Sequence, residues 1–231
     1  MEEHAVSKFR LVFTLSDVDR EWAERLYPRG TFRVLRYPAG LEFIGVSRCE
    51  IRGRVLFVGA LNRPQNVEAV RYLVDRVWPA VRDRYPEAEL RIVGGGMADA
   101  FRRELERIPG VTPVGWVDRI EDEYASASVF AAPILSGGGI IVKILDAMAA
   151  GIPVVTTAFG NEGIGASHGR ETLVADEPEA FASDVCLLLR DTETNRRIGE
   201  AGHSFVGERF GREDVGDTIL KTYREIREGG R

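Results

Sequence analysis

Between residues 54 and 190, short apolar segments alternate with longer segments of helical periodicity, and this alternation most constrains the fold. Several apolar segments have no polar face, which is typical of parallel strands covered by helices on both sides. The alternation predicts an α/β, Rossmann-like doubly wound parallel sheet with strand order 3-2-1-4-5-6. The six predicted strands are residues 54–59, 89–94, 111–115, 128–133, 152–157 and 171–175.

The helices between these strands are predicted from apolar residues spaced three and four apart. The longest covers residues 65–84, and Pro79 is expected to kink or divide it. Pro113 lies in the third predicted strand, and it fits best where no ladder donor is needed. The other predicted helices are residues 97–107, 140–150, 178–190, 194–208 and 212–228.

The first fifty residues have a different organisation. Residues 9–16 read as a strand that runs into a helix capped by Ser16, and residues 31–37 form a second extended segment. This strand–helix–strand pattern is too short for a second complete domain. We therefore predict a short partial α/β segment over residues 1–50 and a complete domain over residues 51–231.

The composition excludes several classes of protein. No apolar run approaches the ~18 residues that a membrane-spanning helix needs, and the N-terminus has no apolar signal-peptide core. The net charge of −5 disfavours a nucleic-acid partner. Cys49 and Cys186 form neither a metal-binding spacing nor a disulfide framework. We expect a cytoplasmic chain with no membrane span and no nucleic-acid partner.

In a doubly wound sheet, a ligand binds beyond the carboxyl ends of the strands, where the strand order reverses. The proposed order brings together the loops that follow the first and fourth strands. The second of these loops contains Gly137, Gly138 and Gly139 and opens directly into a helix. Free N–H groups at a helix start suit a phosphate, and glycines allow close approach. The alternative is a flexible turn or a tight helix–sheet contact.

Lys143 and Asp146 lie three residues apart on the helix that follows, and so share a face. One interpretation is a cation for a phosphate and a carboxylate for ribose hydroxyls. The other is an exposed ion pair that contributes a few tenths of a kcal/mol. The apolar residues around them predict a mostly buried helix, on which two charges need a reason.

Two other nucleotide motifs do not fit. The glycines at positions 94–96 follow the second strand, and Asp99 stands where a dinucleotide fingerprint needs a glycine. No glycine precedes Lys143 and Ile144 follows it, which excludes a P-loop. Val117 and Asp118 follow the third strand and are candidates for contact with a nucleobase, whereas a solvated helix start is the simpler interpretation of Asp118.

Three segments carry a more specific pattern: VLFVGALNRPQNVEAVRYLV (residues 55–74), GWV (115–117) and PILSGGGIIVKILDAMAAGIPVVTT (133–157). Together they resemble the family 4 retaining glycosyltransferases. The resemblance implies the GT-B fold, in which the nucleotide-sugar donor binds the C-terminal of two Rossmann-like domains. It implies that residues 51–231 are that domain and that residues 1–50 are the tail of the N-terminal domain plus a linker. It also implies that no metal and no other cofactor is needed.

The resemblance also assigns residues. Many family members have two glutamates seven residues apart, and these positions hold Gly138 and Asp146 here. Asp146 would bind the ribose, and Gly137, Gly139 and Lys143 match a G-x-G-x-x-x-K subgroup. The candidate donor-binding residues are Asn62, Arg63, Gly137, Gly138, Gly139, Ile140, Ile141, Lys143 and Asp146, with Val117 and Asp118 for the nucleobase. No catalytic residue and no metal ligand is assigned.

The leading hypothesis is therefore the donor-binding domain of a retaining glycosyltransferase that is inactive without an N-terminal domain. The alternative is a non-catalytic or degenerate GT-B module that acts as a partner subunit. It is favoured by departures from the family pattern at Leu135, Gly138 and Gln65. The expected partners are a nucleotide sugar and either a separate N-terminal GT-B domain or a second copy of the chain. A GT-B epimerase would need both domains and further carboxylates.

Overall fold

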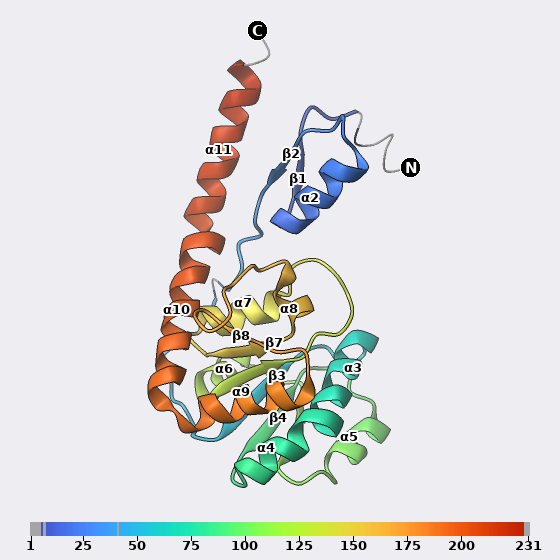
Figure 1. Cartoon of the computed structure of the whole chain (residues 1–231), viewed down its shortest axis with the longest axis vertical. Coiled ribbons are helices and arrows are strands. Elements are labelled where there is room, and N and C mark those ends of the chain that lie inside the picture. The colour runs from blue at the N-terminus through green and yellow to red at the C-terminus, as the bar shows by residue number, and fades with distance from the viewer. Residues whose placement is uncertain (1–5, 7, 41, 229–231) are drawn as a thin grey trace.

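A six-stranded parallel sheet forms the centre of the computed structural model, which describes residues 6, 8–40 and 42–228 (Figure 1). The spatial order β5-β4-β3-β6-β7-β8 confirms the predicted order 3-2-1-4-5-6. All neighbouring strands pair in parallel, so their carboxyl ends share one edge. The strands are β3 (Arg54–Val58), β4 (Glu89–Val93), β5 (Val111–Gly115), β6 (Val129–Ala132), β7 (Val154–Thr156) and β8 (Leu173–Val174).

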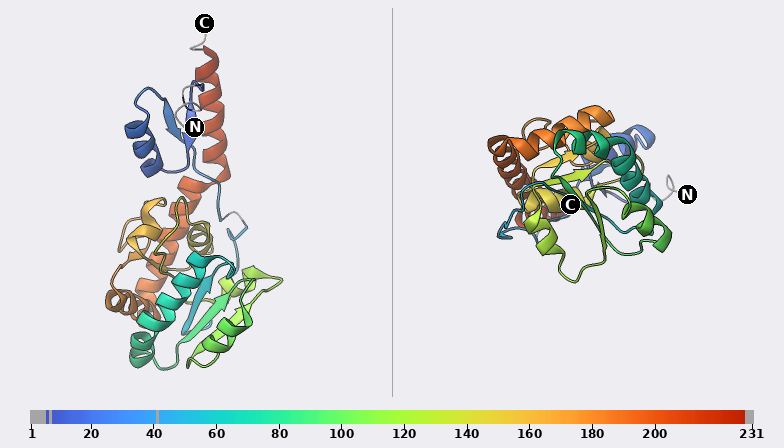
Figure 2. Two further views of the ribbon diagram at one scale, coloured as in Figure 1. Left: turned by 90° about the vertical axis from the view of Figure 1, so that its right-hand side faces the viewer. Right: turned by 90° about the horizontal axis from the view of Figure 1, so that it is seen from below.

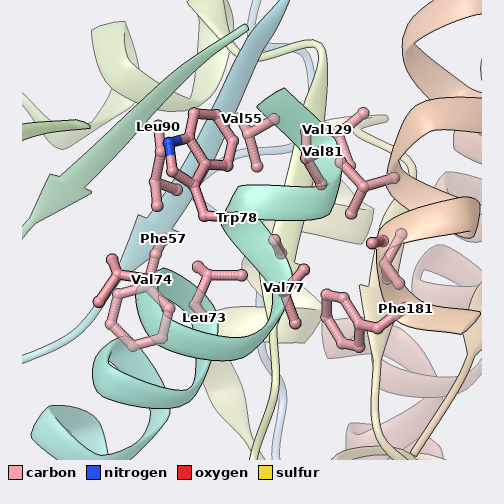
Figure 3. Close-up of a cluster of buried hydrophobic side chains, with 14 of the residues drawn as sticks. Val55, Phe57, Leu73, Val74, Val77, Trp78, Val81, Leu90, Val129 and Phe181 are labelled. Atoms are coloured by element: carbon pink, nitrogen blue, oxygen red, sulfur yellow. The ribbon is translucent and has the colours of Figure 1, made fainter. Parts of the chain in front are cut away.

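Helices cover both faces of this sheet. On one face lie α3 (Pro64–Tyr72), the π-helix η1 (Leu73–Val77), α4 (Trp78–Arg84), α5 (Asp99–Leu105) and α9 (Pro178–Arg190). On the other lie α6 (Ile120–Ser126), α7 (Val142–Ala149) and most of α10 (Thr192–Phe210). A cluster of buried apolar residues lies on each face of the sheet: the first under α3, η1, α4, α5 and α9, the second under α6, α7 and α10. In β3, Val55 and Phe57 belong to the first core cluster and Leu56 to the second, which explains why this strand has no polar face. Figure 3 shows Leu73 and Val74 beside Phe57, and Trp78 beside Leu90 and Val55.

Both prolines singled out in the sequence lie where their missing N–H does little harm. The predicted helix over residues 65–84 is divided into α3, η1 and α4, and Pro79 lies in the first turn of α4. Pro113 lies in β5, which is an edge strand, and it pairs with Ile92 just before the register shifts.

The first residues form the small unit that was predicted. Strands β1 (Val12–Thr14) and β2 (Phe32–Val34) pair in parallel, and α2 (Asp17–Leu26) connects them. The Ser16 side chain caps α2 by accepting a hydrogen bond from the Asp19 N–H at 3.0 Å. Residues 1–5 and 229–231, the outer ends of the two predicted domains, lie outside the described residues.

The final helix, α11 (Arg212–Glu228), extends past the six-stranded sheet and runs beside the β1–β2 unit (Figures 1 and 2). Arg33 in β2 pairs with Glu225 at 2.5 Å and donates to the Thr222 hydroxyl at 3.3 Å. Residues 189 positions apart in the sequence therefore hold the small unit against the last helix. In the described part of the chain, no helix is long and apolar enough to cross a membrane.

The structure differs from the prediction mainly at helix ends. Helix α7 begins at Val142, not at Ile140 as predicted, because residues 134–141 leave the sheet as a loop. A short helix, α8 (Ala158–Glu162), was not predicted, although Thr157 caps it by accepting from the Gly160 N–H at 3.1 Å. Five residues with a glycine at the centre are too few for a periodicity signal.

Candidate functional site

The loops that follow β3 and β6 meet at the carboxyl edge of the sheet, as the strand order predicts. Lys143 in α7 donates from Nζ to Oδ1 of Asn66 in α3 at 2.6 Å, and Asn66 Nδ2 donates to the Ala60 carbonyl at 2.8 Å. The backbone of Gly59 lies close to both side chains. A Cβ added at Gly59 would lie 2.8 Å from Asn66 Cγ and 2.9 Å from Lys143 Nζ. The switch point of the sheet therefore carries a half-buried cation.

The surroundings of Lys143 make its charge costly. Its Nζ lies 4.7 Å from the centroid of the Phe57 ring, and Phe57 is fully buried. Burial, followed by the positive charge of Arg63, lowers the pKa of Lys143 to about 8. An ammonium that is poorly solvated and lies next to a second cation favours binding of an anion.

The glycine loop leaves room for a ligand. Gly137 and Gly139 have φ of +125° and +74°, a region that favours glycine. A Cβ at any of the three loop glycines would meet nothing within 4 Å. The loop leads to Ile141, which provides no side-chain cap for α7, so the first N–H groups of that helix lack a side-chain acceptor. The side chains of Ile140 and Ile141 are partly buried and pack against the second core cluster.

The same loop is tied to α3. Ser136 Oγ donates to Glu68 at 2.6 Å. A cavity of about 850 Å³ lies between the loop and the helix, lined by Leu61, Pro64, Val67 and Leu135 among others. Lys143 does not line this cavity, so this hollow is next to the switch point and not at it.

Asp146 faces the linker that joins the two units. It lines a cavity of about 400 Å³ together with Tyr37, Glu42 and Arg212, and its carboxylate accepts a hydrogen bond from the Gly40 N–H. Burial raises its pKa to about 6, the Gly40 hydrogen bond opposes this shift, and the charge of Glu42 adds to it. Among the described ion pairs, none joins Lys143 to Asp146, so the exposed pair that the sequence allowed does not form.

Asp146→Asn is expected to stabilise the chain at neutral pH. A carboxyl group whose folded-state pKa is raised is disfavoured when it is ionised, and asparagine keeps an acceptor for Gly40. We expect a gain of about 1 to 3 kcal/mol above pH 6, or roughly 3 to 8 °C in Tm. The gain should shrink as the pH falls below 6 and disappear below about pH 4, where Asp146 is protonated in both states. Thermal melts from pH 4 to 8 measure it, and a pH-independent difference would contradict it.

The glycines at positions 94–96 have a packing role, which agrees with the interpretation of a plain turn. Gly94 has φ of +143°, and a Cβ there would lie 1.9 Å from the Gly59 carbonyl oxygen. The Leu61 N–H donates to the Gly95 carbonyl at 2.7 Å, and Gly96 packs on Asn62. These contacts fix the loop that presents Asn62 and Arg63, both of which are exposed.

The remaining candidates lie apart from Lys143. Val117 is partly buried against the second core cluster, whereas Asp118 is exposed. Trp116 was not singled out, yet its side chain is 78% exposed and its ring lies beside Gly95 at the carboxyl edge. The His168 Nδ1 accepts a hydrogen bond from the Val174 N–H at 2.9 Å, which gives this histidine a structural partner.

Sequence reasoning also missed Asn66. It lies in the first turn of α3, inside a loop that was considered, but nothing in its type or spacing connects it to a lysine 77 positions away. A pairing of β3 with β6 predicts only that the two loops are neighbours. Which side chains meet depends on how α3 and α7 are oriented over the sheet edge.

Comparison with known proteins adds three findings. Residues 52–191 match the sequence profile of the family described as glycosyl transferases group 1. Among curated proteins, an uncharacterised 44.6 kDa protein of the cps region of Klebsiella pneumoniae is 28% identical over 175 residues, which are 72% of this chain and 45% of that protein. A phosphatidyl-myo-inositol mannosyltransferase of Mycobacterium tuberculosis is 31% identical in a gapped alignment of 233 positions, which covers 94% of this chain and 60% of that enzyme.

Solved structures show the same fold. Anabaena HepE in complex with UDP superposes with a TM-score of 0.79 at 17% identity, over 96% of this chain and 66% of that chain. Sucrose-phosphate synthase from Thermosynechococcus elongatus gives 0.77 at 21% identity, over 99% of this chain and 61% of that chain. The chain thus spans about half to two-thirds of the length of these relatives. Because the profile match covers more than half of its residues, the chain belongs to the family of group 1 glycosyl transferases.

Proposed function

We propose that this chain is the donor-binding part of a retaining glycosyltransferase and binds a nucleoside-diphosphate sugar. The observation that carries the proposal is the half-buried Lys143 ammonium at the sheet's switch point, beside a glycine loop that opens into a helix. Such a site suits a diphosphate. The mannosyltransferase relative and the UDP-bound neighbour support the same ligand class.

The proposed roles follow the geometry. The N–H groups of Gly137, Gly138 and Gly139 and of the first turn of α7, with Ile140 and Ile141 leading into it, would contact the diphosphate. Lys143 and Arg63 would offset its charge, and the amide of Asn62 would add a hydrogen bond. Val117 and Asp118 would lie nearest the base. Asp146 would accept from the ribose in place of, or beside, the Gly40 N–H that it now binds.

The chemistry of this part of the enzyme would be electrostatic. As the bond between the sugar and the diphosphate breaks, negative charge grows on the leaving phosphate, and prepositioned N–H groups and cations stabilise it. We assign no general base, because the family resemblance places the corresponding elements in the N-terminal domain. Transfer to an acceptor would need a second domain across the cleft, and we expect the chain alone to turn over no donor.

A thermal-shift panel with UDP, GDP, ADP and their sugar conjugates tests the proposal. Binding at 100 times Kd stabilises the folded state by about 2.7 kcal/mol, which is roughly 5 to 10 °C for a chain of this size. A shift with one nucleotide is the expected result, and it would identify the base. A well-folded protein that shifts with none of them contradicts the proposal.

A second candidate, a partner module, is favoured by the apolar surface of the small unit and α11. Trp22 and Leu26 of α2 are 57% and 64% exposed, and Leu220 and Tyr223 of α11 are 56% and 70% exposed. A surface of this kind suits contact with another protein domain or with a second copy. Analytical ultracentrifugation tests this candidate, and a monomer at high concentration would count against self-association.

A further inference from the structure

We propose that Asn66 is a positioning residue, which holds the ammonium group of Lys143 at the switch point so that it meets the diphosphate of the donor already in place. This inference rests on the proposed function, because it takes the diphosphate as the ligand of Lys143. It adds a residue that the sequence pattern of the glycine loop does not contain.

The hydrogen bond between these residues connects opposite faces of the sheet. Helix α3 contributes Ala69 and Val70 to the first core cluster, and α7 contributes Ile144 and Leu145 to the second. The Lys143 side chain nevertheless reaches Asn66 and the ring of Phe57, which belong to the first face. It therefore crosses the strand ends, at the switch point where a doubly wound sheet binds its ligand.

Asn66 is itself fixed in orientation. Its Nδ2 donates to the Ala60 carbonyl at 2.8 Å, and its backbone N–H donates to the Arg63 carbonyl at 3.0 Å. Because the Ala60 carbonyl accepts only from the amide nitrogen, the amide oxygen must point toward Lys143. A rotated amide would place a donor against the ammonium and leave both without an acceptor.

The neighbours restrict the ammonium further. A Cβ at Gly59 would lie 2.8 Å from Asn66 Cγ and 2.9 Å from Lys143 Nζ, so the backbone there approaches both groups closely. The Phe57 ring lies on another side, 4.7 Å from Nζ. A free lysine side chain loses much rotamer freedom when it binds an anion. Because Asn66, Gly59 and Phe57 already confine the Lys143 side chain, less conformational entropy is lost when it binds the diphosphate.

An amide suits this task better than a carboxylate. The Asn66 oxygen accepts from the ammonium without cancelling its charge, so the full positive charge stays available to a phosphate. Arg63, the charged group whose field acts on Lys143, is also positive. A glutamate or aspartate at position 66 would form an ion pair with Lys143 and repel the diphosphate.

The first test needs no nucleotide. The chain has three lysines, Lys8, Lys143 and Lys221, so ¹³C-methylation gives a simple NMR spectrum in which each amine is titrated separately. Asn66→Asp is expected to raise the pKa of Lys143 by at least about one unit, because a carboxylate replaces a neutral acceptor. Gln65→Ala, its exposed neighbour, is the control and should leave it unchanged. An unchanged Lys143 titration in Asn66→Asp would overturn the inference.

The second test measures coupling by calorimetry with UDP and GDP as probes. Asn66→Ala is expected to weaken binding about tenfold in the wild-type chain and to have no further effect in the Lys143→Met chain. Equal losses in both backgrounds, or no loss in a folded Asn66→Ala chain, would overturn the positioning role. A wild-type chain that binds neither nucleotide, nor any other in the thermal-shift panel, would overturn the proposed function instead. The titration of Lys143 separates failure of the positioning role from failure of nucleotide binding, because it depends on the contact with Asn66 and not on a nucleotide. It also tests the positioning role if Asn66→Ala folds poorly.

Discussion

Gly94→Ala is expected to lower the free energy of unfolding by about 2 to 6 kcal/mol. Alanine is strained at a φ of +143°, which alone costs about 1 to 3 kcal/mol. Its Cβ would also lie 1.9 Å from the Gly59 carbonyl oxygen, which is backbone and cannot rotate away. The ends of β3 and β4 would have to separate, which adds a loss of the order of 1 to 3 kcal/mol. We expect Tm to fall by roughly 10 °C.

Gly207→Ala is the matched control. Gly207 lies inside α10, and a Cβ there would meet nothing within 4 Å. The same chemical change should therefore stabilise the chain by about 0.5 to 1 kcal/mol, because alanine is the better helix former. If the close packing of Gly94 determines its stability effect, Tm should fall in Gly94→Ala and rise in Gly207→Ala, which thermal melts measure. A Gly94→Ala chain that melts within 2 °C of the wild type would contradict the close approach.

Lys143→Met is expected to weaken nucleotide binding by about 10- to 100-fold, as fits the loss of charge-assisted contacts of about 1.5 to 3 kcal/mol. The wild-type affinity should itself fall as the pH rises from 7 to 9, because the pKa of Lys143 is about 8 and the ammonium loses its proton. The affinity of Lys143→Met should lack this dependence. Calorimetry with the nucleotide that stabilises the wild type measures both effects.

The stability of the same variant separates a binding role from a structural one. A lysine whose folded-state pKa is lowered is disfavoured in its charged form, so methionine should raise Tm at pH 7. Lys221 lies on the exposed surface of α11, so Lys221→Met is the control for both measurements. It should change neither the nucleotide affinity nor Tm. A Lys143→Met chain that binds as tightly as the wild type, or that binds weakly because it melts early, would contradict the assignment.

The order of the sheet was predictable because it depends on a pattern that the whole chain repeats. Strands that are apolar on both faces must be covered by helices, and the alternation of strands and helices leaves few topologies. Pro113 even indicated an edge strand, since a proline there breaks no ladder hydrogen bond. The start of α7 was placed two residues early, because the apolar pair Ile140–Ile141 continues the helical pattern while packing as loop.

The site was predictable only in part. Glycines, a lysine and an aspartate after the fourth strand indicated a nucleotide, but their neighbours come from elsewhere in the chain. Lys143 meets Asn66 and Phe57, and Asp146 meets Gly40 of the linker. Spacing on one helix placed the lysine and the aspartate on one face. It did not show that one reaches across the strand ends while the other contacts the segment between the two units.

The contact between β2 and α11 has a consequence for the order of events during synthesis. Arg33 is made 189 residues before its partner Thr222, and Glu225 follows three residues after that. The six-stranded sheet is complete once residue 174 has been added, because all its strands lie between residues 54 and 174. The contact of the small unit with α11, by contrast, waits for a loop closure of 189 residues. We therefore expect the small unit to dock late, although its own strands and helix are close in sequence, and until then the part of β2 that faces α11 remains accessible to chaperones.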